Sequence, residues 1–238
     1  MKRPVLTIAF DDGYIDAYNH AIAYLNEVGL KCTFAVPAGL IGKTCEKRPV
    51  LGWEQIGELT NKGHEIASHT LHHVNLLKTT STHNSVKKEI EGPKAILEKR
   101  ISGLTIDSFV YPYIDKLPDP DIQKYVKTTY TSARISEDSP IYNSLPIMDF
   151  YSLKGFCVNN TYALKDLQGH IEHTLETNCY FIEVFHLVGK KNTMSSSKNE
   201  PYRFYLHIDN FKKHIDFILK SDIEVLTQRD AVNVFSSS

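Results

Sequence analysis

Two adjacent carboxylates, Asp11 and Asp12, stand between an apolar run over residues 7–10 and a glycine, Gly13. Ionised carboxylates side by side repel each other, so such a pair is usually kept where a positive charge lies nearby or where one carboxyl stays protonated. Side chains alternate in direction along a strand, so the two groups at its end can serve different purposes. One can bind a cation while the other handles a proton. A polar turn that closes the strand is the alternative interpretation, because Asp and Gly are ordinary turn residues.

Three histidines lie within residues 69–73. On a helical turn, His69 and His73 are four residues apart and would face one side, close enough to share a metal ion. Asp12 would add a carboxylate oxygen to the two nitrogens and leave coordination positions open for water. The pair His69 and His72 is a rival that the spacing leaves open. Surface histidines at the start of a polar helix would give the same pattern.

The elements that must position these groups can be predicted from the hydrophobic pattern, in which apolar runs alternate with amphipathic segments. We expect strands at residues 5–10, 31–37, 64–68, 108–111, 127–133, 150–158, 179–185 and 224–227. We expect helices at 16–28, 53–62, 86–100, 164–177, 211–221 and 229–235, and a long polar loop at 134–147. Gly92 and Pro93 predict a bend or a late start in the helix at 86–100. The alternation predicts one α/β domain over residues 1–238, either a barrel or an open, mostly parallel sheet.

Four groups of candidate residues follow the ends of predicted strands. Asp11 and Asp12 follow the first strand and the histidines of 69–73 follow the third, while residues 111–113 and His186 follow two later strands. In parallel α/β folds the carboxyl ends of the strands gather catalytic groups at one rim, so we expect all four groups to meet there. His186 ends a strongly apolar strand and should be partly buried; a hydrogen-bonded core histidine is the alternative.

The composition argues against several classes of protein. The chain has 27 Lys and Arg against 28 Asp and Glu, a net charge of −1, and no basic stretch, which disfavours nucleic-acid binding. No apolar run approaches the roughly 20 residues of a transmembrane helix. Residues 1–4 lead directly into a strand without an apolar leader, as expected of a cytoplasmic protein or of a chain whose leader has been removed. The four cysteines have no Cys-x-x-Cys spacing and are expected to be free and buried.

Four motifs stand at the strand ends: Ala9-Phe10-Asp11-Asp12-Gly13, His69-Thr70-Leu71-His72-His73, Tyr111-Pro112-Tyr113 and Val184-Phe185-His186. In this order they resemble the motifs of the NodB-homology polysaccharide deacetylases, the fourth carbohydrate esterase family. The likeness covers nearly the whole chain. Segments 53–56 and 63–69 look like the beginning of that family's second strand, and 225–227 looks like its terminal strand.

The resemblance implies a distorted (β/α) barrel of about seven strands, with the active site at the C-terminal ends of the strands. It also implies a divalent metal ion, usually zinc, bound by Asp12, His69 and His73. The register of the family motif favours His73 over His72 as the second histidine ligand.

The same resemblance implies roles for residues around the metal. Asp11 would be the general base and His186 the general acid, and the backbone N–H of Tyr113 would help to bind the oxyanion. Tyr111, Tyr113 and Trp53 could stack on sugar rings, although aromatic side chains near a site more often serve packing.

Three positions depart from the family pattern. Many members have an arginine that holds the base two residues before the motif proline, where this chain has Val110. Ile114 stands where a glycine often follows. The carboxylate that often tunes the acid histidine has no clear match, with Asp149 as a candidate. A subgroup with Tyr-Pro-Tyr and no arginine acts on exopolysaccharide, and this chain looks closer to that branch.

We therefore predict a metal-dependent hydrolase, a polysaccharide deacetylase that removes N-acetyl groups from an acetylated glycan or amino-sugar oligomer. Its products would be acetate and a free amino sugar. One alternative keeps the site but changes the substrate to a non-sugar amide or an O-acetyl ester. Another is a glycan-binding protein with a catalytically weak site, which Val110 and Ile114 motivate.

Overall fold

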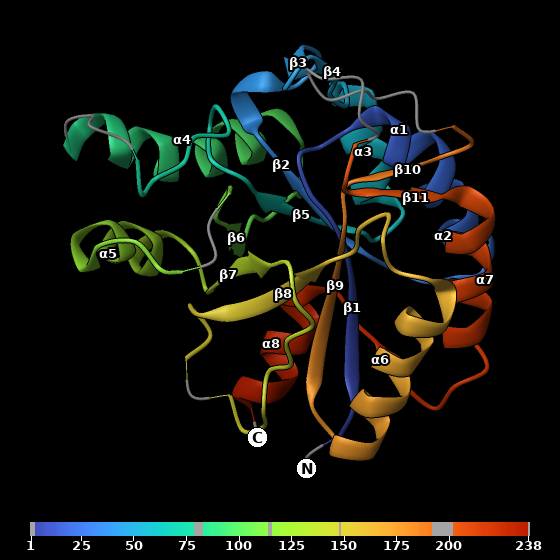
Figure 1. The fold of residues 1–238 in the computed structure, drawn as a ribbon. Coiled ribbons are helices and arrows are strands. Elements are labelled where there is room, and N and C mark those ends of the chain that lie inside the picture. Colours follow the sequence, from blue (N-terminus) through green and yellow to red (C-terminus); the bar gives the residue numbers. More distant parts are fainter. Residues whose placement is uncertain (1–2, 79–82, 114–115, 148, 192–201, 238) are drawn as a thin grey trace.

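Seven parallel strands form a closed barrel in the computed structural model, which describes residues 3–78, 83–113, 116–147, 149–191 and 202–237 (Figure 1). The barrel strands are β1 (Val5–Phe10), β2 (Thr33–Val36), β5 (Glu65–Ser68), β6 (Ser108–Val110), β7 (Ser132–Glu137), β8 (Leu153–Cys157) and β9 (Tyr180–Phe185). Each strand pairs with the next in this order, and β9 pairs with β1 to close the barrel. The prediction of a distorted barrel of about seven strands is confirmed.

A short eighth strand lies next to β1, beside the part of β1 that β2 does not pair with. β12 (Glu224–Val225) pairs with the first half of β1, and β2 pairs with its second half. Two small sheets lie outside the barrel. One is the antiparallel hairpin of β3 (Thr44–Cys45) and β4 (Arg48–Pro49), and the other is the parallel pair of β10 (Leu187–Gly189) and β11 (Tyr205–His207).

Helices cover the outside of the barrel. α4 (His83–Arg100) and α5 (Pro120–Thr129) pack together on one side, and α6 (Leu164–Thr177) and α7 (Ile208–Ile218) pack together on the other (Figure 1). The remaining helical segments are α1 (Ile15–Ala17), the π-helical η1 (Tyr18–Ile22), α2 (Ala23–Glu27), the 3-10 segment η2 (Ala38–Leu40), α3 (Trp53–Asn61) and α8 (Gln228–Ser236). None of the helices in the described ranges is long and apolar enough to cross a membrane.

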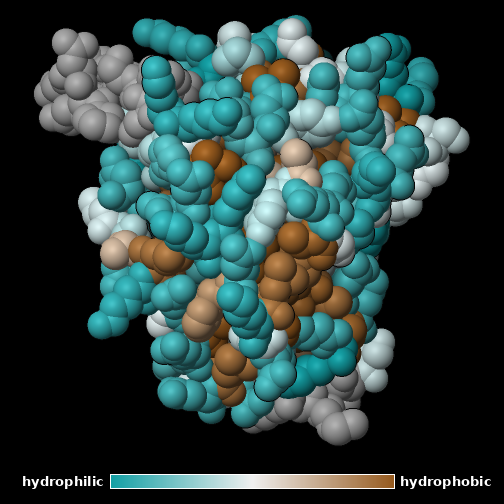
Figure 2. Space-filling model, turned by 90° about the vertical axis from the view of Figure 1, so that its right-hand side faces the viewer, coloured by the Kyte–Doolittle hydropathy of each residue, from teal (hydrophilic) through white to brown (hydrophobic). Residues whose placement is uncertain are grey.

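The apolar side chains of the strands hold the helices in place. Ile8 and Phe10 of β1 belong to the large cluster shared with the outer helices, whereas Val5 and Ala9 belong to a second cluster that includes residues of α8. This division follows the alternation of side chains along a strand. On the side of α6 and α7 the surface is mostly hydrophilic, with hydrophobic side chains gathered in its middle (Figure 2).

Polar side chains at the beginnings of the strands connect the barrel to α8. Glu65 Oε2 accepts hydrogen bonds from Thr33 Oγ1 at 2.8 Å and from the backbone N–H of Arg229 at 3.0 Å. Gln228 Nε2 donates to Ser132 Oγ at 3.1 Å. Burial raises the pKa of Glu65 despite these hydrogen bonds. The network closes the end of the barrel opposite the carboxyl ends of the strands.

Two predicted elements are wrong. Residues 127–129, expected in a strand, form the last turn of α5, and residues 134–137, expected in a loop, belong to β7. In β7, Ala133 and Ile135 pack into the core while the polar residues between them point the other way. Because the inner face of this strand is polar, its average hydrophobicity resembles that of a loop.

Candidate active site

The carboxyl ends of the barrel strands surround a cavity of about 640 Å³. Most of the residues predicted for the site line this cavity together: Asp11, Asp12, His69, His73, Tyr111, Tyr113 and His186. Each follows the end of a strand, because parallel strands deliver their last residues to one rim. The predicted meeting of the four groups is therefore observed in the structure.

Asp12, His69 and His73 form a buried cluster that could hold a metal ion. Asp12 Oδ1 lies 2.9 Å from His73 Nε2 and 3.3 Å from His69 Nε2. One candidate ligand atom from each residue lies within 4.8 Å of the others. Two imidazole nitrogens and one carboxylate oxygen with remaining open positions are a donor set typical of catalytic zinc.

The outer contacts of the two histidines support this assignment. His69 Nδ1 lies 2.9 Å from the carbonyl oxygen of Val110, which can only accept a hydrogen bond. The proton must therefore be on Nδ1 when the imidazole is neutral, which leaves Nε2 free to bind a cation. Among the described residues, His73 Nδ1 has no hydrogen bond of normal geometry, but the Cys45 thiol next to it contributes to raising the pKa of His73. The residues present thus fit a metal ion.

The electrostatics of the cluster favour an ionised Asp12 carboxylate next to a protonated His73. Burial disfavours the Asp12 carboxylate, but the positive charge of His186 and the hydrogen bonds from His69 and His73 outweigh it and hold the pKa of Asp12 well below its usual range. Burial lowers the pKa of His73, but its interactions with Asp12 and Cys45 together outweigh burial and raise the pKa to about 10. A cation in the cluster would replace this proton as the partner of the carboxylate.

The backbone at the site is strained. Asp12, Thr70, His73 and Tyr113 all have φ between 57° and 67°, a left-handed conformation that non-glycine residues rarely adopt. Such residues persist only where surrounding contacts fix them, and they cluster at functional sites. The predicted helical turn at 69–73 is wrong, because this segment is a turn without helical structure.

The structure separates the two rival histidine pairs. His72 is directed away from Asp12, with its Nδ1 2.6 Å from Glu89 Oε1 and its side chain half exposed. His73, with a left-handed backbone, turns its ring toward Asp12 instead. The cluster consequently contains His73 and not His72.

Asp11 has a partner that the sequence did not reveal. The guanidinium of Arg134 forms a bidentate ion pair with it, with Nη1 3.2 Å from Oδ2 and Nη2 in close contact with Oδ1. Arg134 Nη1 also donates to Ser136 Oγ at 2.9 Å, and Arg134 is fully buried. Arg134 lies in β7 directly beside Val110 of β6. The segment had been predicted as a loop, so no signal placed this arginine inside the barrel.

His186 lies at the end of β9 with its ring stacked against Phe204, at a centroid distance of 4.9 Å. Its Nδ1 is buried and has no hydrogen-bond partner in the described part of the chain. Asp149, the candidate for tuning this histidine, instead accepts a hydrogen bond from the N–H of Tyr151 at 2.8 Å. The described residues show no contact between Asp149 and His186.

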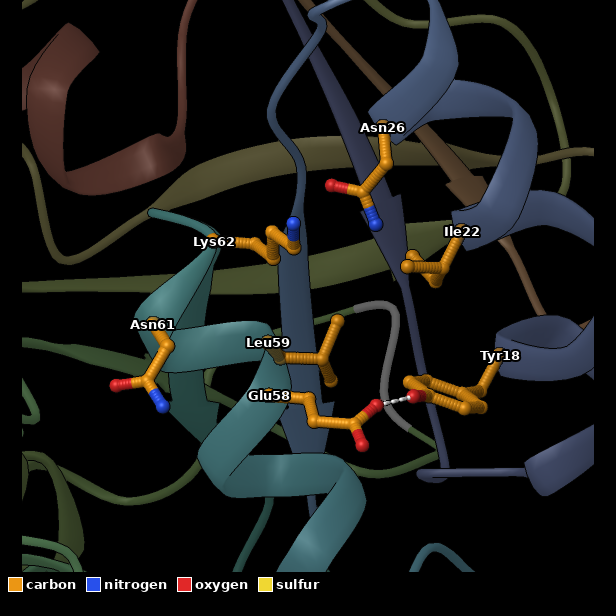
Figure 3. A pocket seen from close by; sticks show the side chains of 7 residues that line it. All are labelled: Tyr18, Ile22, Asn26, Glu58, Leu59, Asn61 and Lys62. Atoms are coloured by element: carbon orange, nitrogen blue, oxygen red, sulfur yellow. Dashed lines mark hydrogen bonds between the residues drawn. The ribbon is translucent and has the colours of Figure 1, made fainter.

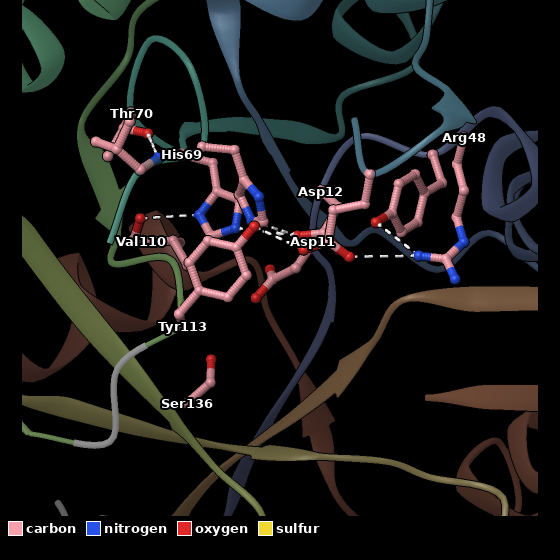
Figure 4. A network of polar contacts seen from close by, with 12 residues as sticks. Asp11, Asp12, Arg48, His69, Thr70, Val110, Tyr113 and Ser136 are labelled. Atoms are coloured by element: carbon pink, nitrogen blue, oxygen red, sulfur yellow. Dashed lines mark hydrogen bonds and ion pairs between the residues drawn. The ribbon is translucent and has the colours of Figure 1, made fainter. Parts of the chain in front are cut away.

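The hairpin of β3 and β4 forms a further wall that the sequence did not predict. Glu46 accepts a hydrogen bond from the hydroxyl of Tyr113 at 2.6 Å. The guanidinium of Arg48 lies 3.7 Å from the ring centroid of Tyr202 and 3.3 Å from the hydroxyl of Tyr14. Tyr113 and Arg48 flank the two aspartates from opposite sides (Figure 4). The hairpin therefore fixes the aromatic rim of the cavity.

Two other predicted residues lie differently from the sites expected. Trp53 begins α3 and does not line the cavity; the Arg100 guanidinium lies 5.4 Å from the centre of its ring. Its role in stacking on a sugar ring therefore stays a prediction. Ile114 lies outside the described residues.

A second cavity of about 250 Å³ lies between η1, α2 and α3, where Tyr18 donates a hydrogen bond to Glu58 (Figure 3). The Oδ1 of Asn26, which lines it, accepts a hydrogen bond from His64 Nε2 at 3.1 Å, and Cys32 Sγ lies 3.3 Å from His64 Nδ1. This order of groups resembles a nucleophile, base and orienting amide. Burial raises the pKa of Cys32 and lowers that of His64 to about 4, and Cys32 is fully buried. The trio is therefore a core contact.

Comparison with protein families matches residues 1–132, more than half of the chain, to the family described as polysaccharide deacetylase. The chain belongs to the polysaccharide deacetylase family. YxkH of Bacillus subtilis (strain 168), named for the same family, is 39% identical over 78 residues. This match covers 32% of the chain and only 26% of YxkH, so it spans about a quarter of that relative.

Solved structures of this family share the fold. The Xyl-CE4 domain of a multidomain xylanase from the hindgut metagenome of Trinervitermes trinervoides has a TM-score of 0.57 at 13% identity, covering 94% of this chain and 87% of that one. BA3943 from Bacillus anthracis, described as a CE4 family pseudoenzyme, has a TM-score of 0.58 at 9% identity, covering 97% and 66%. Streptococcus pyogenes deacetylase PplD, in complex with acetate, has a TM-score of 0.52 at 23% identity, covering 62% of each chain.

Proposed function

We propose that this member of the polysaccharide deacetylase family is a metal-dependent hydrolase that removes N-acetyl groups from an amino-sugar polymer or oligomer. The observation that carries the proposal is the buried cluster of Asp12, His69 and His73, with Asp11 and His186 in the same cavity. The pseudoenzyme among the similar folds shows that fold alone does not decide activity. The side chains of the site therefore carry the argument.

Zinc is the metal we propose, because two imidazole nitrogens and a carboxylate oxygen suit it. A divalent cation held by Asp12, His69 and His73 would polarise the acetyl carbonyl and lower the pKa of water at the site. The ligand residues are buried and their outer contacts fix the ring of His69, so little rearrangement would be needed on binding.

The chain supplies the proton transfers. Asp11 takes the proton from the attacking water as the new bond to the acetyl carbon forms. His186 donates a proton to the amide nitrogen as the carbon–nitrogen bond breaks, which gives acetate and a free amine. The backbone N–H of Tyr113 stabilises the negative charge that develops on the carbonyl oxygen. The packing of Phe204 on the His186 ring supports this orientation of the acid.

Arg134 supports the assignment of Asp11 as the base. Its bidentate ion pair with Asp11 fixes both carboxylate oxygens and keeps them turned from Asp12, whose carboxylate faces the histidines. The two adjacent aspartates thus have separate partners, as their different roles require.

The rim of the cavity suits a glycan. Tyr113 is 57% exposed and Phe204 also lines the cavity, so both offer aromatic surface to a sugar ring. A cavity of about 640 Å³ lies within the usual range for small-ligand sites. These features support an acetylated sugar as the group that enters the site.

The proposal is tested by measuring acetate release from N-acetylglucosamine oligomers with metal-stripped protein, with and without added zinc. We expect release only when zinc is restored. If zinc binds and none of the acetylated sugars is hydrolysed, the proposal fails in favour of another acyl substrate or of a glycan-binding role. Assays on O-acetyl esters and small amides separate these two outcomes.

A further inference from the structure

The segment that carries both histidine ligands is bound to helix α4 at the point where Pro93 removes one helical hydrogen bond. The helix itself runs without interruption from His83 to Arg100, so the predicted late start is wrong. Pro93 lies four residues after Glu89 and has no N–H, so the carbonyl of Glu89 lacks its normal partner within the helix. The backbone N–H of Leu71 lies 3.1 Å from this carbonyl oxygen and donates to it. The helix therefore offers a backbone acceptor to the loop between His69 and His73.

The side chain of Glu89 makes a second set of contacts with the same loop. Its Oε2 accepts hydrogen bonds from the backbone N–H groups of Leu71 at 3.0 Å and His72 at 2.9 Å. Its Oε1 lies 2.6 Å from His72 Nδ1. Hydrogen bonds to a carboxylate are stronger than those between neutral groups. One residue of α4 thus holds two successive peptide units of the loop.

The 3-10 segment η2 holds the loop from the opposite side. The N–H groups of Ala38 and Gly39 donate to the carbonyl oxygens of Thr70 at 3.2 Å and Leu71 at 2.7 Å. A Cβ atom at Gly39 would lie 2.7 Å from the Leu71 oxygen, so only glycine allows this approach. The loop is therefore clamped between η2 and α4.

The clamp offsets a conformational cost. Thr70 and His73 have φ values of 61° and 57°, a left-handed conformation that is unfavourable for residues other than glycine. Without outside contacts the loop would relax, and the imidazole of His73 would leave Asp12. We propose that Glu89 is a positioning residue that holds loop 69–73 in its metal-binding conformation, and that His72 belongs to this clamp and is not a ligand.

The inference rests on the metal site of the proposed function, but its test does not need a substrate. Zinc affinity of metal-free protein is measured by titration calorimetry with a competing chelator for Glu89→Ala, Glu89→Gln and Glu91→Ala. We expect Glu89→Ala to weaken zinc binding roughly tenfold, as outer-shell changes do, and Glu89→Gln to weaken it less because one acceptor oxygen remains. Glu91→Ala removes a surface ion pair with Lys87 on the same helix and should leave the affinity unchanged.

Two further variants distinguish a histidine that binds the metal from one that only holds the loop. His73→Ala should abolish zinc binding, whereas His72→Ala should weaken it no more than Glu89→Ala does. The inference is overturned if Glu89→Ala and Glu89→Gln both bind zinc as the wild type does, or if His72→Ala loses zinc as completely as His73→Ala. If Glu89→Ala does not fold, Glu89→Gln decides the question alone. Failure of the deacetylase assay with intact zinc binding would contradict the proposed function only.

Discussion

Asp11 and Asp12 are neighbours in the chain, but the structure gives them different surroundings. Asp12 has a left-handed backbone and points its carboxylate at His69 and His73. Asp11 keeps the direction of the strand and pairs with Arg134 inside the barrel. The left-handed turn at Asp12 allows this separation, because it breaks the regular alternation of the strand. The two carboxylates then face different partners.

This division of roles predicts different effects for two matched substitutions. Asp12→Asn should lose zinc binding and acetate release together, since it removes the charged ligand. Asp11→Asn should retain zinc and lower kcat by roughly 10²–10⁴-fold, the contribution of a general base. Zinc content by mass spectrometry and kcat on the same samples provide the comparison. Equal loss of metal in both variants would contradict the assignment.

Arg134 of β7 and Val110 of β6 are paired neighbours in the barrel. The role of Arg134 can therefore be tested by transferring the arginine from position 134 to position 110. Val110 packs in one cluster with Ala35 of β2 and Ala67 of β5, two small side chains. Arg134→Val should lower kcat about 100-fold with little change in zinc affinity, because Asp11 loses its fixed orientation. The double variant Val110→Arg with Arg134→Val should recover part of kcat.

The control for this prediction is the folding stability of each variant. Removing one partner of a buried ion pair costs about 3–5 kcal/mol, so unfolding by urea is followed for each variant. Recovery of stability without recovery of kcat in the double variant would show that Arg134 serves the barrel and not Asp11. Wild-type kcat in a folded Arg134→Val protein would remove the arginine from the mechanism.

At the scale of elements, the helical hydrogen bond that Pro93 removes from α4 connects helix geometry to the site. Pro93→Ala restores an N–H that can bond to the Glu89 carbonyl within the helix, in competition with Leu71. Ala is favoured over Pro by about 3 kcal/mol in a helix interior, so the melting temperature should not fall. Zinc affinity should nevertheless drop several-fold. If Pro93→Ala is destabilised and binds zinc as the wild type does, Pro93 has only a structural role in α4.

The elements that the sequence predicted well are those with strongly apolar strands. β1 and β9 read as continuous apolar runs, and both deliver catalytic candidates where expected. Only Ser132 and Ala133 of β7 lay in the strand predicted at 127–133, and the rest was missed because Arg134 and its polar neighbours face the barrel interior. α5 was missed although Asp119 and Pro120 form a helix start, with Asp119 accepting a hydrogen bond from the N–H of Asp121 at 2.8 Å.

The sequence predicted which residues form the site, but not which other side chains hold them in position. The family motifs pointed to Asp12, His69 and His73, and the structure places these three together. Arg134 contacts Asp11, and Glu89 contacts Leu71 and His72 of the metal-binding loop, across sequence separations of 17 or more residues. No local periodicity encodes such contacts. Long-range contacts depend on strand register and helix position, which only the folded chain defines.

At the scale of the whole molecule, the barrel keeps ionisable groups buried far from the active site. His64 is 3% exposed, and burial lowers its pKa to about 4, so it is neutral in the folded protein at pH 7. The unfolded chain has an ordinary histidine with a pKa near about 6.5. As the pH falls from about 6.5 toward 4, the unfolded state therefore binds a proton that the folded state does not, and folding stability decreases.

This linkage predicts the acid sensitivity of the fold. Between pH 7 and 4.5 the wild type should lose about 2 kcal/mol more unfolding free energy than His64→Gln, whose amide does not titrate. Urea unfolding of both proteins at the two pH values, with chelator present, gives this difference, and all other titrating groups cancel in the comparison. Equal losses would mean that His64 takes up its proton inside the fold without penalty. A larger loss of unfolding free energy in the wild type would show that protonation of His64 weakens its contact with Cys32, next to the pairing of β2 with β5.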